Sequence, residues 1–96
     1  MQQLQVEEDD WVATVYMDDW YIGQVKRIDE REVFIDFLEQ HGHLRLEFRK
    51  PSRKDTLQVL FEDVLCVIED PARKRGFKIL EETKSNIESL FSVKNN

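Results

Sequence analysis

Three short strand patterns follow one another so closely in this chain that only tight turns can connect them. Alternating, β-forming residues predict strands over residues 11–17, 20–28 and 32–38. Asp18-Asp19 and residues 29–31 carry the polar side chains that are typical of turns. Because turns of this length connect antiparallel neighbours, the segment predicts three consecutive strands of one sheet.

Two more strands are expected after this segment. Residues 44–49 alternate apolar and charged side chains, which predicts a strand with one solvated face. A last short strand is expected over residues 65–68, after a bend around residues 61–63. Five short strands with tight hairpins predict a mainly β fold, a small five-stranded barrel, because closure removes exposed edges. An open meander sheet covered by a C-terminal helix is the competing architecture.

The hydrophobic period changes near the C-terminus. Asp70 followed by Pro71 predicts a helix over residues 70–92, or two helices divided at Gly76. Apolar residues then recur at three- and four-residue spacing, at Phe77, Leu80, Ile87, Leu90 and Phe91. A helix of this length spans roughly 30 Å, which is longer than a small barrel can cover. Either part of this stripe is an assembly face for an oligomer or hetero-complex, or the whole stripe is intramolecular core.

The composition limits the class of protein. The 96 residues carry a net charge of −6 and 35 % charged residues, which predicts one soluble domain. We expect an acidic, flexible N-terminus at residues 1–10, a barrel at 11–69, the helix at 70–92 and a tail at 93–96. No apolar run approaches the roughly 18 residues of a membrane helix, so no membrane partner is expected. Cys66 is the only cysteine, so no internal disulfide can form and an intracellular location is expected.

Aromatic residues on the first three predicted strands are the strongest functional signal. Tyr16, Tyr21 and Phe37 each lie on a different strand, so the rings could converge at one open end of a barrel. Rings that face one another around a gap attract a cation, and such a box recognises methylated lysine or arginine. The alternative is that Tyr21 and Phe37 are ordinary barrel core. By alternation, Trp20 is expected on the face of its strand opposite Tyr21.

The same residues resemble Tudor domains of the chromatin-reader superfamily, and the pattern is closest to the single Tudor domain of Polycomb-like proteins. Tyr16, Tyr21 and Phe37 match the aromatic positions of these domains over residues 11–39, and residues 57–68 match loosely. The resemblance implies an SH3-like barrel, a nuclear location and a methylated basic peptide as partner. It further implies roles for six residues. Tyr16, Tyr21 and Phe37 would form the cage walls, Asp36 or Glu39 would face the bound ammonium, and Trp20 would border the groove.

The chain departs from that pattern in its second half. Residues 39–43 lack the aromatic residue that often completes the cage, which leaves Phe48 as a distant candidate. The basic loop KPSRKD, residues 50–55, has no counterpart in a minimal Tudor domain. Similar loops occur in Tudor-like segments of transposon-derived proteins, which is a second, weaker resemblance.

Charged clusters indicate further partners. The negative net charge counts against a general nucleic-acid binder. A basic peptide would be drawn to the acidic residues near the first two strands, Glu7, Glu8, Asp9, Asp10, Asp18 and Asp19. Nucleic acid could instead contact a basic stripe at Arg49, Lys50, Arg53 and Lys54, together with a second cluster at residues 73–78. The alternative for each cluster is a solvated face.

No residue pattern indicates catalysis. His41, His43 and Cys66 lack the spacing of a metal site, and Cys66 is expected to be a small buried hydrophobe. We therefore expect no enzyme activity, metal or cofactor. The expected function is a protein-interaction module that binds a methylated lysine or arginine in a basic peptide. The alternatives are a structural adaptor that assembles through its C-terminal helix, and a nucleic-acid-binding domain that uses the basic loop.

Overall fold

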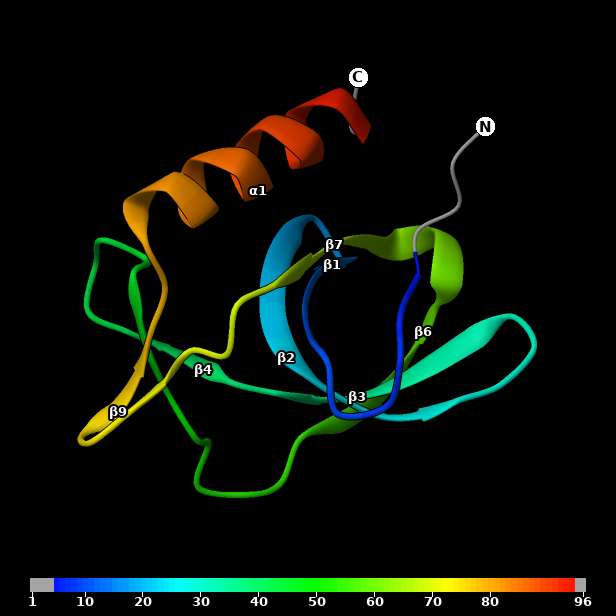
Figure 1. The fold of residues 1–96 in the computed structure, drawn as a ribbon, viewed down its shortest axis with the longest axis horizontal. Coiled ribbons are helices and arrows are strands. Elements are labelled where there is room, and N and C mark those ends of the chain that lie inside the picture. The colour runs from blue at the N-terminus through cyan, green and yellow to red at the C-terminus, as the bar shows by residue number, and fades with distance from the viewer. Residues whose placement is uncertain (1–4, 95–96) are drawn as a thin grey trace.

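The computed structural model describes residues 5–94, which form a mainly β fold with one C-terminal helix (Figure 1). The first sheet has the order β6-β3-β2-β1-β7 and contains β1 (Trp11–Tyr16), β2 (Asp19–Ile28), β3 (Glu32–Phe37), β6 (Thr56–Leu60) and β7 (Val64–Ile68). The second sheet has the order β4-β5-β9-β8 and contains β4 (Glu39–His41), β5 (Glu47–Arg49), β9 (Gly76–Lys78) and β8 (Ala72–Arg73). The 3-10 turn η1 (Phe61–Asp63) joins β6 to β7, and the chain ends in α1 (Glu81–Lys94).

The predicted strand series is present, but the sheets do not close into a barrel. β1, β2, β3 and β7 lie where the sequence predicts strands. The strand expected over residues 44–49 is reduced to β5 and belongs to the second sheet, and β6 occupies its place beside β3. β6 and β7 are the two ends of the first sheet. The five-stranded SH3-like barrel is therefore not confirmed.

The helix begins much later than the sequence predicts. The Ala72 N–H donates a hydrogen bond to Asp70 Oδ1 at 2.9 Å, so Asp70 begins a turn. Gly76 has a φ of +120°, which no helix accepts, and the chain there forms the β8–β9 hairpin. Phe77 lies on β9, with its ring 5.6 Å from that of Trp11. The packing of Phe77 in the second sheet thus overrides the helix signal of the sequence before Glu81.

Both ends of the described chain are more ordered than expected. The Asp9 N–H donates to Val25 O, and the Val25 N–H donates to Asp10 O, both at 2.8 Å. Val6 packs against the core. The flexible N-terminus predicted for residues 1–10 is therefore wrong from Val6 onward, and residues 1–4 lie outside the described part. At the other end α1 extends to Lys94, so the predicted tail is part helix.

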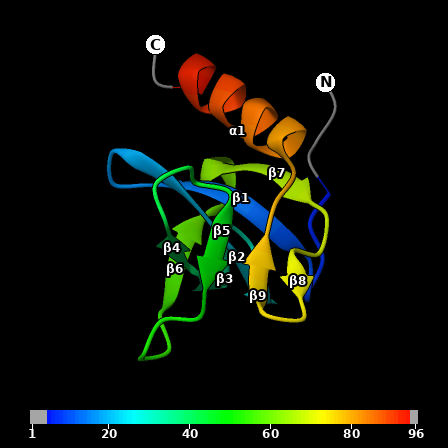
Figure 2. The same ribbon diagram turned by 90° about the vertical axis from the view of Figure 1, so that its left-hand side faces the viewer.

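Two apolar clusters fill the fold, one on each face of the first sheet. The first cluster lies towards α1 and the second sheet, and comprises Ala13, Trp20, Ile22, Leu38, Phe48, Ile68, Ile79 and Ile87. The second comprises Val12, Val25, Val33, Ile35, Phe37, Val59 and Val64. Figures 1 and 2 show β2 curving strongly, with α1 on the side of β7 and β2 that faces the first cluster. Adjacent residues of β1 enter different clusters, so both faces of this central strand are buried.

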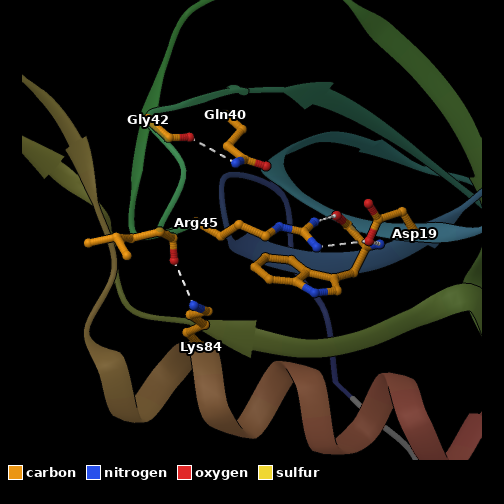
Figure 3. Close-up of polar contacts among 7 residues, drawn as sticks. Asp19, Gln40, Gly42, Arg45 and Lys84 are labelled. Carbon is orange, nitrogen blue, oxygen red and sulfur yellow. Dashed lines mark hydrogen bonds and ion pairs between the residues drawn. The ribbon is translucent and has the colours of Figure 1, made fainter.

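Arg45 covers the first cluster where the two sheets meet (Figure 3). Its guanidinium carbon lies 3.9 Å from the centroid of the Trp20 ring. Arg45 also donates to Asp19 Oδ1 at 3.0 Å and to Trp20 O at 2.7 Å. Arg45 adopts a φ of +58°, a conformation that costs roughly 1–2 kcal/mol for a residue other than glycine. These contacts hold a buried tryptophan, the β1–β2 turn and the β4–β5 loop together.

We expect Arg45→Ala to destabilise the fold by about 2 kcal/mol, because it removes a cation–π contact and two charge-assisted hydrogen bonds. Arg45→Lys should recover only part of this loss, since an ammonium group lacks the planar fork of a guanidinium. Urea denaturation measures both changes. Arg31→Ala is the matched control at an exposed arginine without a carboxylate partner among the described residues. A loss at Arg45 no larger than at Arg31 would contradict this role.

Gly23 permits the close approach of β2 to β3. A Cβ at this position would lie 2.5 Å from Asp36 O and 2.5 Å from Ile35 Cγ2. We expect Gly23→Ala to destabilise the fold by about 1–3 kcal/mol, because the backbone oxygen cannot move without breaking the strand pairing. Gln58→Ala, at an exposed position of β6, should change the free energy of unfolding by less than about 0.5 kcal/mol. Equal losses of stability for the two substitutions in urea denaturation would contradict the claim that β2 and β3 are too close at position 23 to admit a Cβ.

Candidate functional site

The structure brings the rings of Tyr16, Tyr21 and Phe37 together. Their centroids are separated by 6.3 Å for Tyr16 and Tyr21, 6.3 Å for Tyr16 and Phe37, and 6.2 Å for Tyr21 and Phe37. The interplanar angles are 70°, 51° and 77°, so no two rings are stacked face to face. The convergence predicted from the strand pattern is present.

Strand register explains why these rings meet. Tyr16 is the last residue of β1 and pairs with Asp19, so Tyr21 follows two positions along β2. Phe37 is the last residue of β3 and pairs with Gly23, the next residue but one after Tyr21. Two residues apart on a strand means the same face. The three rings therefore gather at one end of the second apolar cluster.

The rings differ in exposure, and so in what they can do. Phe37 is only 6 % exposed and belongs to the second cluster, so the core interpretation of this residue is correct. Tyr21 is 41 % exposed and Tyr16 is half-buried, so neither is ordinary core. Phe37 is therefore a buried apolar residue of the site, while the two tyrosines are exposed enough to contact a ligand.

A pocket of about 270 Å³ opens at these rings. Its other lining residues are Met17, Leu38, Glu39, Asp55 and Leu57. Met17 is the first residue of the β1–β2 turn, is 81 % exposed and adopts a φ of +58°. This strained turn places a flexible thioether side chain in the pocket lining. Loop 50–55 contributes Asp55 to the same lining.

Two carboxylates line the pocket, and Asp36 is not one of them. Asp36 accepts a hydrogen bond from the Thr56 hydroxyl and pairs with Lys26 Nζ at 3.9 Å and Lys54 Nζ at 3.7 Å. As the neighbour of Phe37 on β3, its side chain lies on the other face of the strand. The prediction that Asp36 faces the bound cation is therefore wrong. Glu39 and Asp55 line the pocket instead.

Trp20 and Phe48 are also placed elsewhere. Trp20 is 1 % exposed and lies in the first cluster, with its ring 6.5 Å from that of Phe48. Alternation along β2 correctly predicts that Trp20 and Tyr21 face opposite sides. The prediction that Trp20 borders the groove is wrong, because Arg45 covers its ring.

The acidic residues near β1 and β2 are divided between the two ends of this hairpin. Asp18 and Asp19 lie at the turn beside Met17. Asp9 and Asp10 hydrogen-bond to Val25 of β2, beside the opposite end of β1. β1 has six residues and a strand rises about 3.3 Å per residue, so roughly 20 Å separates the two groups. Of the turn aspartates, Asp18 directly follows the pocket residue Met17, while Asp19 pairs with Arg45.

The predicted basic stripe does not form one continuous surface. Arg49 pairs with Glu39 at 2.6 Å, and Lys54 pairs with Asp36. Lys50 and Arg53 are exposed, and no carboxylate of the described residues lies within 4.0 Å of them. Arg49 of β5 is therefore paired with Glu39 of β4 within the second sheet, and it does not add an unpaired positive charge to the surface.

The stripe predicted as an assembly face is divided in the same way. Phe77 lies on β9, and Ile87 is fully buried in the first cluster. Phe91 packs against that cluster, and Leu90 is half-buried. Leu80 precedes the helix and is 56 % exposed. Most of the stripe is intramolecular core, which was the alternative stated from the sequence.

A second, wider groove lies between β7 and α1, and Glu69 is its central polar group. Its lining includes Val67, Leu80 and Ser89. The Glu69 carboxylate accepts from the Thr83 hydroxyl at 2.8 Å and from the Leu80 N–H at 3.3 Å. Burial alone favours the protonated acid, but the hydrogen bonds from Thr83 and Leu80 and the nearby Arg73 together lower the pKa of Glu69. Glu69 thus caps the start of the helix.

Cys66 and the histidines carry no chemistry in this arrangement. Burial raises the pKa of the Cys66 thiol, and the charge of Glu69 raises it further, so the thiol is protonated at neutral pH. His41 and His43 are exposed on and after β4. Within residues 5–94 no three His, Cys, Asp or Glu side chains are placed to hold a metal ion.

Sequence reasoning missed four pocket residues: Met17, Leu38, Asp55 and Leu57. Met17 follows the first aromatic residue directly and could have been found as the start of a two-residue turn. Asp55 and Leu57 come from the loop before β6, a strand that the sequence pattern did not separate from the following bend. No local signal places that loop beside Phe37; the backbone bond from the Phe37 N–H to Asp55 O at 2.9 Å does so.

We expect Glu69→Gln to destabilise the fold by about 1 kcal/mol at neutral pH, as loss of a helix cap does. Because the folded-state pKa of Glu69 lies below its ordinary value of 4.5, the contribution of the charged form is complete above pH 4.5. It is lost as the pH falls through the folded-state pKa. Urea denaturation of both proteins between about pH 7 and pH 3 measures this. A difference between them that does not shrink with falling pH would contradict the capping role of the charge.

Two findings bear on identity. Among the described residues no helix has the length and apolar character needed to span a membrane. Comparisons with protein-family models, with curated proteins and with solved structures find no match to this chain.

Proposed function

We propose that this chain is a non-catalytic interaction module that binds the methylated ammonium or guanidinium group of a basic peptide in the pocket of Tyr16, Tyr21 and Phe37. The observation that carries the proposal is the near-equal spacing of the three rings. All three residues line the pocket, and a ring face that opens into it would attract a cation. The resemblance to Tudor domains supports the same function, and a nuclear location is part of the proposal.

The ring geometry suits a single cationic group. The centre of the ring triangle lies about 3.6 Å from each centroid, its side divided by the square root of three. A cation above this centre is within the about 6 Å over which a ring attracts it. A volume of about 270 Å³ is below the usual range of about 300–1,000 Å³ for small-molecule sites. The pocket therefore fits one side-chain head group better than a whole cofactor.

Charge at the rim favours a cation over a neutral side chain. Asp55 is exposed, and no basic group of the described residues lies within 4.0 Å of its carboxylate. Glu39 also lines the pocket and is paired with Arg49. Asp18 adds an exposed carboxylate at the turn next to Met17. A basic peptide would thus find its counter-charges on Asp55 and Asp18.

The expected affinity is modest. Each cation–π contact contributes about 0.5–2 kcal/mol, whereas a complex with a dissociation constant of 10 μM requires roughly 7 kcal/mol. Three rings therefore supply only part of the binding free energy, and contacts between the rim carboxylates and the flanking basic residues supply the rest. We expect dissociation constants in the micromolar range for a short peptide.

The SH3-like barrel and the Tudor relation belong to this proposal. Their support is the succession β1, β2 and β3 with one ring on each strand. The η1 turn between the outer strands β6 and β7 is further support, because it brings the two ends of the curved sheet close along the chain.

We expect Tyr21→Ala to weaken binding of a trimethyllysine peptide by about tenfold, since one exposed wall of the pocket is lost. Tyr21→Phe should bind nearly as well as the original protein, because the ring remains. Isothermal titration with a trimethyllysine peptide flanked by arginine residues measures both. A peptide that carries the uncharged carbon analogue of trimethyllysine separates cation–π attraction from apolar contact.

Phe34→Ala is the matched control. Phe34 is a half-buried aromatic residue on β3 that contacts Arg27, with 4.2 Å between the guanidinium carbon and the ring centroid, and it does not line the pocket. Its removal should leave peptide affinity unchanged. Equal binding of the charged and uncharged peptides, or equal losses in Tyr21→Ala and Phe34→Ala, would refute the cage.

A further inference from the structure

Half of the positive charge of this acidic chain is concentrated in two short segments. Residues 50–55 and 73–78 contain seven of the 14 Lys and Arg residues and one of the 20 Asp and Glu residues. The seven are Lys50, Arg53, Lys54, Arg73, Lys74, Arg75 and Lys78, and all of them are exposed. A concentration of this kind in a protein of net charge −6 means that one region is strongly cationic and the remainder strongly anionic.

Strand register places the two segments side by side. β5 pairs with β9 in antiparallel fashion, with Glu47 opposite Lys78 and Phe48 opposite Phe77. The end of β5, where loop 50–55 begins, is therefore adjacent to Gly76, where the tip of the β8–β9 hairpin ends. Both loops project from the same end of the second sheet in Figure 1 and in Figure 2.

The cations of these two loops are largely uncompensated. Of the seven, only Lys54 lies within 4.0 Å of a carboxylate among the described residues. Of the seven Lys and Arg residues elsewhere, five have such a partner: Lys26, Arg27, Arg45, Arg49 and Lys94. Arg73 donates to the carbonyl groups of Asp70 and Ala72, and it lies close enough to Glu69 to help lower the pKa of that carboxyl group. Most cations elsewhere in the chain are thus paired with a carboxylate, whereas most cations of these two loops are not.

We propose that this end of the second sheet, loop 50–55 together with the β8–β9 hairpin tip, binds the phosphate backbone of duplex nucleic acid. Lysine and arginine side chains that neutralise phosphates supply sequence-independent affinity. The β8–β9 hairpin forms the edge of the second sheet, with β9 paired to β5, so its tip would contact phosphates rather than base edges. Loop 50–55, beside it, would contact the adjacent phosphates.

The composition of the two loops distinguishes duplex from single-stranded ligands. Sites for single strands stack bases on aromatic side chains. Residues 50–55 and 73–76 contain no aromatic residue, and the ring of Phe77 is engaged with Trp11. Base stacking is therefore not available at this end, and contact is limited to phosphates. The negative remainder of the chain opposes approach from any other side.

The test measures binding of a fluorescein-labelled DNA duplex of about 20 base pairs by anisotropy, at salt concentrations from about 50 to 200 mM. The original protein should bind, with an affinity that falls steeply as salt increases. Lys74→Gln with Arg75→Gln should weaken binding roughly tenfold and reduce the slope of log affinity against log salt by about 2, since two phosphate contacts are lost. Both residues are exposed, and neither side chain makes a hydrogen bond or ion pair among the described residues, so we expect the fold to be preserved.

Arg27→Gln with Arg31→Gln is the matched control. It removes the same charge from the β2–β3 end of the molecule, far from the hairpin in Figure 1, and should leave duplex affinity unchanged. No duplex binding at about 50 mM salt, or an equal loss in the two double variants, would overturn the proposal. Equal binding of polyglutamate, or tighter binding of a single strand of the same length, would overturn it as well. Tyr21→Ala should leave duplex binding unchanged, so this site and the aromatic pocket can fail independently.

Discussion

The register of β2 between β1 and β3 is the constraint on which the rest of the structure depends. It directs Trp20 and Ile22 into the first apolar cluster and Val25 into the second. Tyr21 lies on the same face of β2 as Val25 but near the start of the strand. It is therefore exposed to solvent at the edge of the second cluster, beside Tyr16 and Phe37. A slip of one residue would exchange the two faces. Gly23, with no room for a Cβ against β3, opposes such a slip.

The sequence predicted what local periodicity determines and failed where tertiary contacts decide. Alternation located β1, β2, β3 and β7 and correctly placed Trp20 opposite Tyr21, because strand period is a local property. The helix was placed about ten residues early, since the pairing of Phe77 with Phe48 across β9 and β5 is invisible in a one-dimensional pattern. The prediction that Asp36 faces the cation fails for a similar reason: only the fold shows that lysines pair with Asp36.

The two proposed sites share one structural element. Loop 50–55 carries Lys50 and Arg53 to the cationic end of the second sheet, and its last residue, Asp55, lines the aromatic pocket. Glu39, which also lines the pocket, is paired with Arg49, the residue directly before this loop. The loop thus carries positive charge to one proposed site and negative charge to the other. A cationic side chain would approach the aromatic pocket, and a polyanion would approach the neighbouring cationic end of the second sheet.

The most direct measurement is an amide NMR titration of the labelled protein with lysine- and arginine-methylated basic peptides, against unmodified peptides of the same sequence. The proposed function predicts methyl-dependent shifts confined to the amides around Tyr16, Met17, Tyr21, Phe37 and Asp55, saturating in the micromolar range. Unchanged spectra up to millimolar peptide, or identical shifts with modified and unmodified peptides, would contradict it. In that case the three rings would be a structural cluster that closes the end of the second apolar core.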